Sequence, residues 1–222
     1  MKQRVRADVT LMLFAIALTG FIYFTPLVRT NSVIWNNALD WIGLMSILKG
    51  TYLRMAARGY KKAFSQKGHD LVVDGLYTLT RNPMYLGTYL IGAGFTLILL
   101  PWWFLAVFSA IFFLRFNKQM VQEETHLKGL FGEKYERYCR TTPRFFPSLK
   151  RSITLKVAEV FPWETCWSTK ERWGLLAWPA LALVLVVIQE YAIYQAIDIL
   201  RVLSVFVSAI LVFGLALFFH YR

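Results

Sequence analysis

The sequence predicts an all-α membrane protein, a polytopic bundle of about six transmembrane helices. Hydrophobic residues make up 57% of its 222 residues, and its mean hydropathy is +0.45. Soluble domains average roughly 45–50% apolar residues. The apolar residues gather in stretches close to the roughly 20 residues that a spanning helix needs. Backbone groups in a bilayer must be hydrogen-bonded internally, so we expect helices rather than open strands.

Six apolar stretches account for the predicted helices: residues 8–28, 32–49, 84–100, 102–116, 173–188 and 199–219. The first follows a basic N-terminal segment, as in a signal peptide. It is too long for one and no small-x-small cleavage motif follows it, so we expect an uncleaved helix. The second stretch is less apolar because it contains Asn36, Asn37 and Asp40. Pro101 separates the third stretch from the fourth.

Basic residues predict the orientation of these helices. They precede the first stretch, follow the second and belong to a mixed-charge segment over residues 118–172. The opposite loops hold little charge beyond Arg29 and residues 190–201. Because cytoplasmic loops are enriched in Lys and Arg, we expect both termini and both charged segments in the cytoplasm.

The formal charge of +12 has a simple explanation in a membrane protein, since cytoplasmic loops meet anionic lipid. The chain has no nucleic-acid-binding module, so we expect no nucleic-acid partner. Cys139 and Cys166 both fall on the predicted cytoplasmic side, where thiols stay reduced. Their spacing fits no zinc pattern, and His126 and His220 are isolated, so we expect no metal site.

The third helix has a local start signal. Asn82 suits the N-cap position and Pro83 suits the first helical turn. The residue before a proline is biased away from helix. The free N–H groups of this first turn would face the cytoplasm and could bind an anionic group. The alternative is that Asn-Pro only begins a spanning helix, and both interpretations stay open from these residues alone.

Two motifs carry a resemblance to a known family. The first comprises His69, Leu71, Val72, Gly75, Tyr77, Arg81, Asn82, Pro83, Tyr85 and Gly87. The second comprises Glu123, Glu124, Leu127, Phe131, Gly132, Tyr135, Tyr138 and residues 143–147. Together they resemble the isoprenylcysteine carboxyl methyltransferase family, whose superfamily includes phospholipid and thiol methyltransferases. The resemblance covers the middle third strongly and leaves out residues 150–222. We therefore divide the chain into a methyltransferase core (1–150) and a linker with two additional helices (151–222).

The resemblance implies S-adenosylmethionine as the cofactor, in a cytoplasmic pocket capped by residues 118–147. The implied cofactor-binding residues are His69, Leu71, Val72, Tyr77, Arg81, Asn82, Pro83, Met84, Tyr85, Gly87, Glu123 and Glu124. Tyrosine faces suit the sulfonium cation, and Glu123 suits the ammonium or ribose groups. A lipid or lipidated acceptor would enter from the bilayer.

The family usually has histidine where this chain has Asn82. Asparagine donates and accepts hydrogen bonds but does not titrate near neutral pH. We therefore expect this position to orient the cofactor rather than remove a proton. Methyl transfer from an activated sulfonium to a thiolate or carboxylate depends more on alignment than on a strong base.

Several residues have a second interpretation. Glu123 and Glu124 could be surface charges near Lys118 and Lys128. Arg81, Arg115 and Arg144 lie near predicted membrane boundaries, where basic anchors are common. We favour Arg115 as the residue that orients an anionic substrate group, because it ends the predicted fourth helix close to Glu123. Gly92-Ala93-Gly94 resembles the glycine pair of phospholipid methyltransferases, and the alternative is that these small residues serve close helix packing. Asp40 could contact substrate, face an interior partner or lie near the membrane edge.

Two other functional classes remain. An NADPH-dependent sterol or lipid reductase is similar in Tyr138-Cys139 and in residues 143–147, although the sequence has no separate basic motif for a 2′-phosphate. A non-catalytic scaffold or transporter is the other, although the sequence has no internal repeat. The last two helices could form a wall, an oligomer interface or a substrate gate. Trp163, Cys166 and Trp167 could form an interfacial segment. The acceptor and the oligomeric state stay undetermined.

Overall fold

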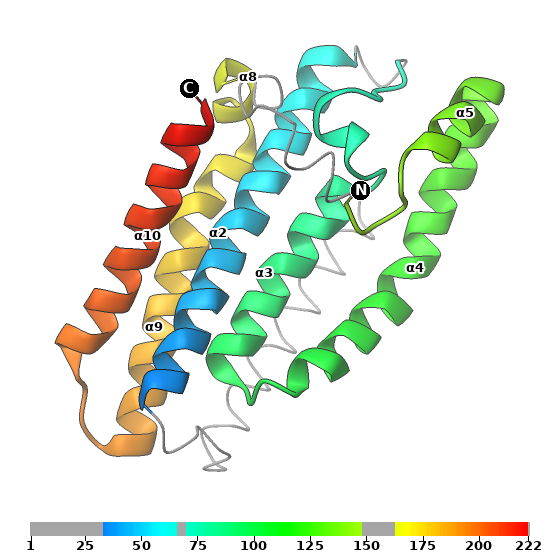
Figure 1. Ribbon diagram of the computed structural model, residues 1–222. Coiled ribbons are helices and arrows are strands. Elements are labelled where there is room, and N and C mark those ends of the chain that lie inside the picture. The colour runs from blue at the N-terminus through cyan, green and yellow to red at the C-terminus, as the bar shows by residue number, and fades with distance from the viewer. Residues whose placement is uncertain (1–32, 66–69, 148–162, 222) are drawn as a thin grey trace.

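The computed structural model describes residues 33–65, 70–147 and 163–221, and within these ranges the chain is all helical (Figure 1). The helices are α2 (Val33–Phe64), η1 (Gly75–Thr78), α3 (Pro83–Leu99), α4 (Phe104–Phe131), α5 (Glu133–Thr141), α8 (Trp163–Trp167), η2 (Lys170–Trp173), α9 (Gly174–Tyr194) and α10 (Ile199–Tyr221). The prediction of an all-α fold is thereby confirmed for the described residues. The predicted helix over residues 8–28 lies outside them.

Two helices extend well past their predicted ends, and α9 also continues to Tyr194 rather than ending at residue 188. The hairpin around Pro101 is confirmed, because α3 ends at Leu99 and α4 begins at Phe104. However, α4 continues to Phe131 rather than ending at residue 116, and α2 continues to Phe64 rather than ending at Lys49. The added segments are rich in Lys, Arg, Glu, Gln, Ala and Leu, which have high helix propensity. The apolar stretch marks the predicted membrane segment, while the helix itself extends beyond it.

Three of the described helical segments are long and apolar enough to cross a membrane: residues Phe104–Phe131, Lys170–Tyr191 and Ile199–Phe218. Helix α3 is apolar but shorter. Helix α2 does not reach the same apolarity, since its first turns carry Asn36, Asn37 and Asp40. The described residues therefore contain three candidate spans, and the predicted total of about six is not confirmed.

Helices α2 and α3 form the centre of the molecule and approach each other through glycines. A Cβ atom on Gly43 would lie 2.7 Å from the carbonyl oxygen of Gly94. One on Gly50 would lie 2.6 Å from the carbonyl oxygen of Gly87. Glycine allows this backbone-to-backbone approach, as is common between membrane helices. The structure thus gives Gly94 a packing role, and Gly92 packs against the Phe108 ring.

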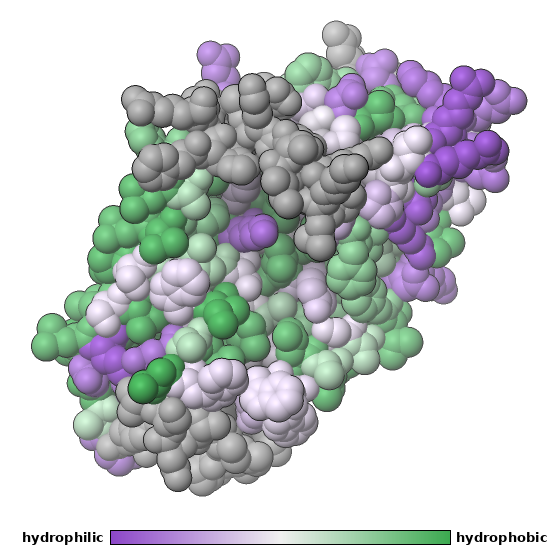
Figure 2. All heavy atoms as spheres, in the orientation of Figure 1, coloured by the Kyte–Doolittle hydropathy of each residue, from purple (hydrophilic) through white to green (hydrophobic). Residues whose placement is uncertain are grey.

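Helices α9 and α10 cover one flank of α2, and α4 lies on the other side of α3 (Figure 1). The largest apolar cluster joins α2, α3, α9 and α10: Leu44, Ile47, Leu48, Ile98, Ala182, Val186, Val202, Val205, Phe206 and Ala209. Figure 2 shows hydrophobic side chains along the helical flanks and hydrophilic ones gathered at the α5 end.

A buried charge cluster joins α2 to this C-terminal pair. Arg201 of α10 contacts Asp40 of α2 at 3.1 Å (Nη2 to Oδ2) and Glu190 of α9 at 3.1 Å (Nη1 to Oε1). The side chains of Asp40 and Glu190 are only 2% and 3% exposed. Of the interpretations open for Asp40, the structure supports an interior partner.

Candidate cofactor site

The start of α3 is placed as predicted, but Asn82 does not cap it with its side chain. Asn82 occupies the N-cap position without a side-chain capping bond, and Pro83 begins the helix. Instead, Asn82 Nδ2 donates to Glu124 Oε1 at 3.2 Å and to the backbone oxygen of Arg144 at 3.0 Å. The amide therefore connects α3 to α4 and to the segment after α5.

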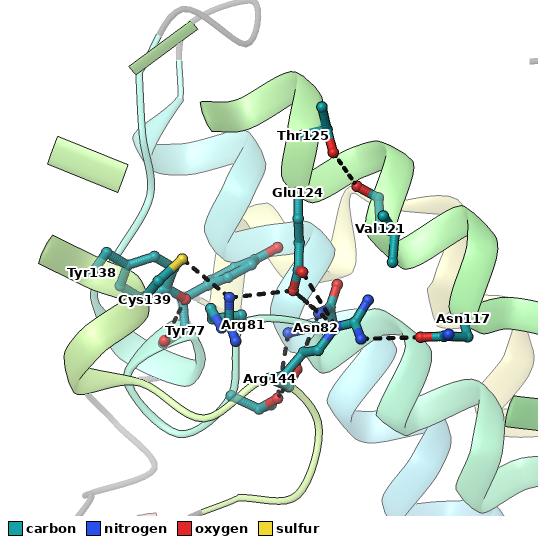
Figure 3. Close-up of polar contacts among 11 residues, drawn as sticks. Tyr77, Arg81, Asn82, Asn117, Val121, Glu124, Thr125, Tyr138, Cys139 and Arg144 are labelled. Atoms are coloured by element: carbon teal, nitrogen blue, oxygen red, sulfur yellow. Dashed lines mark hydrogen bonds and ion pairs between the residues drawn. The ribbon is translucent and has the colours of Figure 1, made fainter. Parts of the chain in front are cut away.

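Glu124 is the centre of a charged cluster, the Glu124 hub, which also contains Arg81, Asn82 and Arg144 (Figure 3). Its carboxylate lies 3.4 Å from Arg81 Nη1 and 3.2 Å from Arg144 Nε. These side chains come from the loop before α3, from α4 and from the segment after α5. The hub therefore brings together the two sequence motifs, which are separated by the α3–α4 hairpin.

Hydrogen bonds to backbone carbonyls hold α5 and the segment after it against the loop before α3. Arg81 N donates to the oxygen of Pro143 at 2.9 Å, and Thr80 Oγ1 donates to the oxygen of Arg144 at 3.1 Å. Tyr138 of α5 donates its hydroxyl to the oxygen of Tyr77 at 2.7 Å. Because the backbone is tied in this way, the geometry of the hub does not depend on exposed side chains.

The hub carries an excess of positive charge, since two guanidinium groups face one carboxylate. Burial lowers the pKa of Arg81, but Glu124 and Cys139 raise it more, so the net pKa lies above its ordinary value. Arg81 Nε and Arg144 Nη2 are buried without a hydrogen-bond partner among the described residues. Buried N–H groups are costly when unpaired, so the hub is suited to an additional anionic group.

The neighbouring tyrosines are hydrogen-bond donors rather than bases. Burial raises the pKa of Tyr77 to about 12, with a smaller opposing effect of Arg58. Burial also raises the pKa of Tyr138 well above its usual value. Both phenols therefore stay protonated at neutral pH. As Asn82 does not titrate either, the polar groups in this part of the site are hydrogen-bonding groups rather than acids or bases at neutral pH.

Glu123 faces a different direction from Glu124. Tyr85 of α3 donates its hydroxyl to Glu123 Oε1 at 3.1 Å, and the Tyr85 ring packs edge-on against Phe116 with 5.7 Å between centroids. Lys128, which could have paired with these carboxylates, instead contacts Glu136 at 2.9 Å. The surface-charge interpretation therefore does not hold for Glu124, which is paired with arginines.

The structure separates the predicted site residues into groups. Arg81, Asn82 and Glu124 belong to the hub, with Tyr85 and Glu123 paired beside it. Gly87 packs against α2, and Tyr77 and Met84 join an apolar cluster on the α2 side. Leu71 and Val72 lie, half-buried, in the irregular stretch before η1. His69 lies outside the described residues.

Arg115 is exposed on α4. It was favoured as a substrate-orienting residue because it ended the predicted fourth helix, but α4 continues to Phe131, so that argument no longer applies.

Sequence reasoning missed two neighbours of the hub. Asn117 Oδ1 accepts a hydrogen bond from Arg144 Nη1 at 3.0 Å, and Cys139 Sγ accepts one from Arg81 Nη1 at 3.0 Å. Asn117 lies seven residues before Glu124 on α4, a spacing that places both on one face of a helix. That spacing was a usable signal for Asn117, whereas nothing local linked Cys139 to Arg81.

Comparisons with known proteins agree with the motifs. The model of the phospholipid methyltransferase family matches residues 38–134. The chain is 28% identical over 119 residues to a protein-S-isoprenylcysteine O-methyltransferase of Schizosaccharomyces pombe, which covers 52% of this chain and 50% of that protein. It is 29% identical over 129 residues to protein-S-isoprenylcysteine O-methyltransferase B of Arabidopsis thaliana, covering 57% of this chain and 66% of that protein.

A third relative has a different name. The chain is 27% identical over 114 residues to a nickel-cobalt-cadmium resistance protein of Alcaligenes xylosoxydans xylosoxydans, covering 50% of this chain and 51% of that protein. The chain thus spans about half to two thirds of the length of these relatives. No solved structure matches it. The predicted similarity to isoprenylcysteine and phospholipid methyltransferases is confirmed, and the family match includes Arg81, Asn82 and Glu124 of the hub but ends before Arg144.

Proposed function

We propose that this protein is an integral membrane methyltransferase that uses S-adenosylmethionine and acts on a lipid or lipidated acceptor. The observation that carries the proposal is the Glu124 hub, which connects the two motif segments through Arg81, Asn82 and Arg144. The family match over residues 38–134 and the O-methyltransferase names of two relatives support it. The acceptor is an isoprenylcysteine carboxylate, a phospholipid amine or a thiol.

The residues around the hub fit the chemical groups of this cofactor. The buried Nε–H group of Arg81, which has no partner among the described residues, suits the cofactor carboxylate. Glu123, held by the Tyr85 hydroxyl, has a carboxylate that suits an ammonium or ribose hydroxyls. When bound, S-adenosylmethionine supplies a methyl group activated by its sulfonium. In this proposal Asn82 orients rather than titrates, because its amide is engaged by Glu124 and by the Arg144 backbone.

We assign the orientation of the acceptor to Arg144 rather than to Arg115. Arg144 spans from Glu124 to Asn117 and keeps one buried nitrogen without a partner among the described residues. Arg115 is exposed on α4. A carboxylate or thiolate acceptor already has its lone pair at neutral pH, so a guanidinium that aligns it is more useful than a base.

The proposal includes a membrane orientation. The hub and α5 lie at the end of the bundle that we place in the cytoplasm, because basic residues gather there. The remaining predicted spans and the division into residues 1–150 and 151–222 are part of the proposal. No specific observation favours the reductase or the scaffold alternative, and NADPH is therefore included as a second ligand in the test.

The test is calorimetric titration of the detergent-purified full chain with S-adenosylmethionine and its demethylated product. We expect micromolar binding, weakened about ten-fold or more by Tyr85→Phe and Glu123→Gln, since losing one charge-assisted hydrogen bond costs about 1.5–3 kcal/mol. Glu133→Gln is the matched control, because the Glu133 side chain is 89% exposed on α5. A folded wild-type protein that binds NADPH and neither nucleoside would overturn the proposal.

A further inference from the structure

The segment from α8 to η2 packs closely against the C-terminal half of α2. Cys166 is fully buried over Gly59, where a Cβ atom on the glycine would lie 2.8 Å from the Cys166 Cα. Thr169 is also buried and donates its hydroxyl to the oxygen of Cys166 at 2.7 Å. The contact is backbone to backbone, so the orientation of the segment is fixed by α2.

The acidic charge on the inner side of this segment is neutralised. Glu171 of η2 is paired with Arg54 at 3.1 Å (Nε to Oε2) and with Arg58 at 3.3 Å (Nε to Oε1), and its side chain is only 14% exposed. At the edge, Lys62 Nζ donates to Ser168 Oγ at 2.7 Å. The carboxylate nearest to α2 is therefore engaged inward and does not offset basic groups that face outward.

The outward side combines aromatic and basic side chains. We define the interfacial patch as Lys62, Trp167, Lys170, Arg172 and Trp173, all of which are exposed. Trp173 is 62% exposed. The Arg172 guanidinium lies 5.1 Å above the Trp173 ring centroid and donates to the oxygen of Trp167 at 3.1 Å. Glu164 of α8 is an exposed acid beside the patch.

The interfacial patch lies at the start of a candidate membrane span, which places it at the lipid headgroup level. Lys170 begins a segment, Lys170–Tyr191, that is long and apolar enough to cross a membrane. Tryptophan together with Lys or Arg at the end of such a segment is typical of the headgroup level, where rings sit at the interface and charges reach lipid phosphates. The headgroup level accommodates exposed rings and exposed cations together. Bulk water is unfavourable for the rings, and the hydrocarbon core is unfavourable for the cations.

From this juxtaposition we infer that the interfacial patch binds the headgroups of anionic phospholipids. Its cations match the phosphate oxyanions, and Arg172 is held in place by Trp167 and Trp173 before any lipid arrives. The surface lies outside the region that matches the family, residues 38–134, apart from the end of α2. The inference does not depend on the proposed methyltransferase function and is tested without a cofactor.

The experiment titrates the detergent-purified full chain with short-chain phosphatidylglycerol, with phosphatidylcholine and with inorganic phosphate, and follows thermal unfolding. We expect phosphatidylglycerol to raise the melting temperature at lower concentration than phosphatidylcholine, with little effect of phosphate. Lys170→Gln combined with Arg172→Gln is expected to weaken the apparent phosphatidylglycerol affinity roughly 25-fold, since each cation near an anionic surface is worth about five-fold.

The matched control removes two cations elsewhere, Lys134→Gln with Arg137→Gln on exposed positions of α5. It is expected to keep the wild-type affinity. Trp173→Ser retains the patch cations and is expected to reduce the advantage of lipid over phosphate. The inference fails if the patch double variant binds phosphatidylglycerol like the wild type, if both double variants weaken it equally, or if phosphate stabilises the protein as well as the lipid does.

Discussion

The adjacent residues Glu123 and Glu124 of α4 contact different parts of the site. Consecutive residues on a helix point about 100° apart, so Glu123 reaches Tyr85 of α3 while Glu124 reaches Arg81 and Arg144. Sequence reasoning placed both carboxylates in the site but could not distinguish their directions. The distinction matters because Glu124 lies between two cations, and its loss would remove the carboxylate that pairs with both of them.

We therefore predict that Glu124→Gln is the more damaging of the two substitutions. It keeps the size of the side chain but removes the charge between Arg81 and Arg144, whose burial makes unpaired cations costly. We expect a loss of about 1–3 kcal/mol in stability and a fall of roughly ten-fold or more in cofactor affinity. Thermal unfolding and calorimetry measure the two effects, with Glu133→Gln as the control. A wild-type melting temperature and affinity in Glu124→Gln would show that the hub is dispensable.

The two cysteines are predicted to differ in reactivity. Burial raises the pKa of the Cys166 thiol to about 12. Because only the thiolate reacts readily, this thiol stays protonated and unreactive at every pH well below 12. Cys139 is partly exposed and contacts Arg81. We expect N-ethylmaleimide at pH 7–9 to label Cys166, in a Cys139→Ser variant, at least about ten-fold more slowly than Cys139 in a Cys166→Ser variant.

Denaturant is expected to remove this difference, because the Cys166 thiol is then exposed to water and regains the ordinary thiol pKa of about 8.5. Labelling of native Cys166 at the denatured rate would contradict its burial against Gly59.

At the scale of helices, apolarity and local start signals predicted where α3 and α4 begin but not where α2 and α4 end. Apolar residues report the membrane segment, whereas a helix continues as long as propensity and packing favour it. The Asn82-Pro83 start was visible because capping preferences are local. The use of the Asn82 amide was not visible, because its partners Glu124 and Arg144 lie 42 and 62 residues away in the sequence.

The α2–α3 interface gives a prediction with a matched pair of substitutions. Gly50→Ala would place a methyl group 2.6 Å from the Gly87 oxygen and 2.9 Å from the Ile91 nitrogen, which are backbone atoms and cannot turn aside. We expect the helices to be forced apart at a cost of about 1–3 kcal/mol. Gly129→Ala on α4 meets nothing within 4 Å and is expected to stabilise by up to about 1 kcal/mol through helix propensity.

Thermal unfolding of both glycine variants in the same detergent measures the contrast. Equal melting temperatures for the two variants would mean that α2 and α3 do not approach through glycine.

At the scale of the whole molecule, the sequence was least informative about the role of the C-terminal helices, α9 and α10. The resemblance ended before residue 150, so it offered no role for α9 or α10. The structure packs them on α2 and secures them by charge at both ends, through Glu171 with Arg54 and through Arg201 with Asp40. Sequence patterns do not reveal such pairs, because 161 residues separate Asp40 from Arg201 and each reads locally as a costly charge in an apolar stretch.

The Arg201 cluster leads to a prediction about how the C-terminal pair is held. Arg201→Met leaves the buried carboxylates of Asp40 and Glu190 without their cation, which typically costs about 3–5 kcal/mol. Adding Asp40→Asn and Glu190→Gln removes the two buried carboxylate charges, so the triple variant is expected to recover most of the lost stability. Arg137→Met, at a side chain 81% exposed, is the control for removing an arginine. Thermal unfolding, with proteolysis in the α9–α10 turn, measures whether the pair detaches.

A single variant as stable as the wild type would show that apolar packing alone holds α9 and α10 on α2. A triple variant no more stable than Arg201→Met would show that the ion pairs themselves, rather than the avoidance of unpaired charge, determine how firmly they are held.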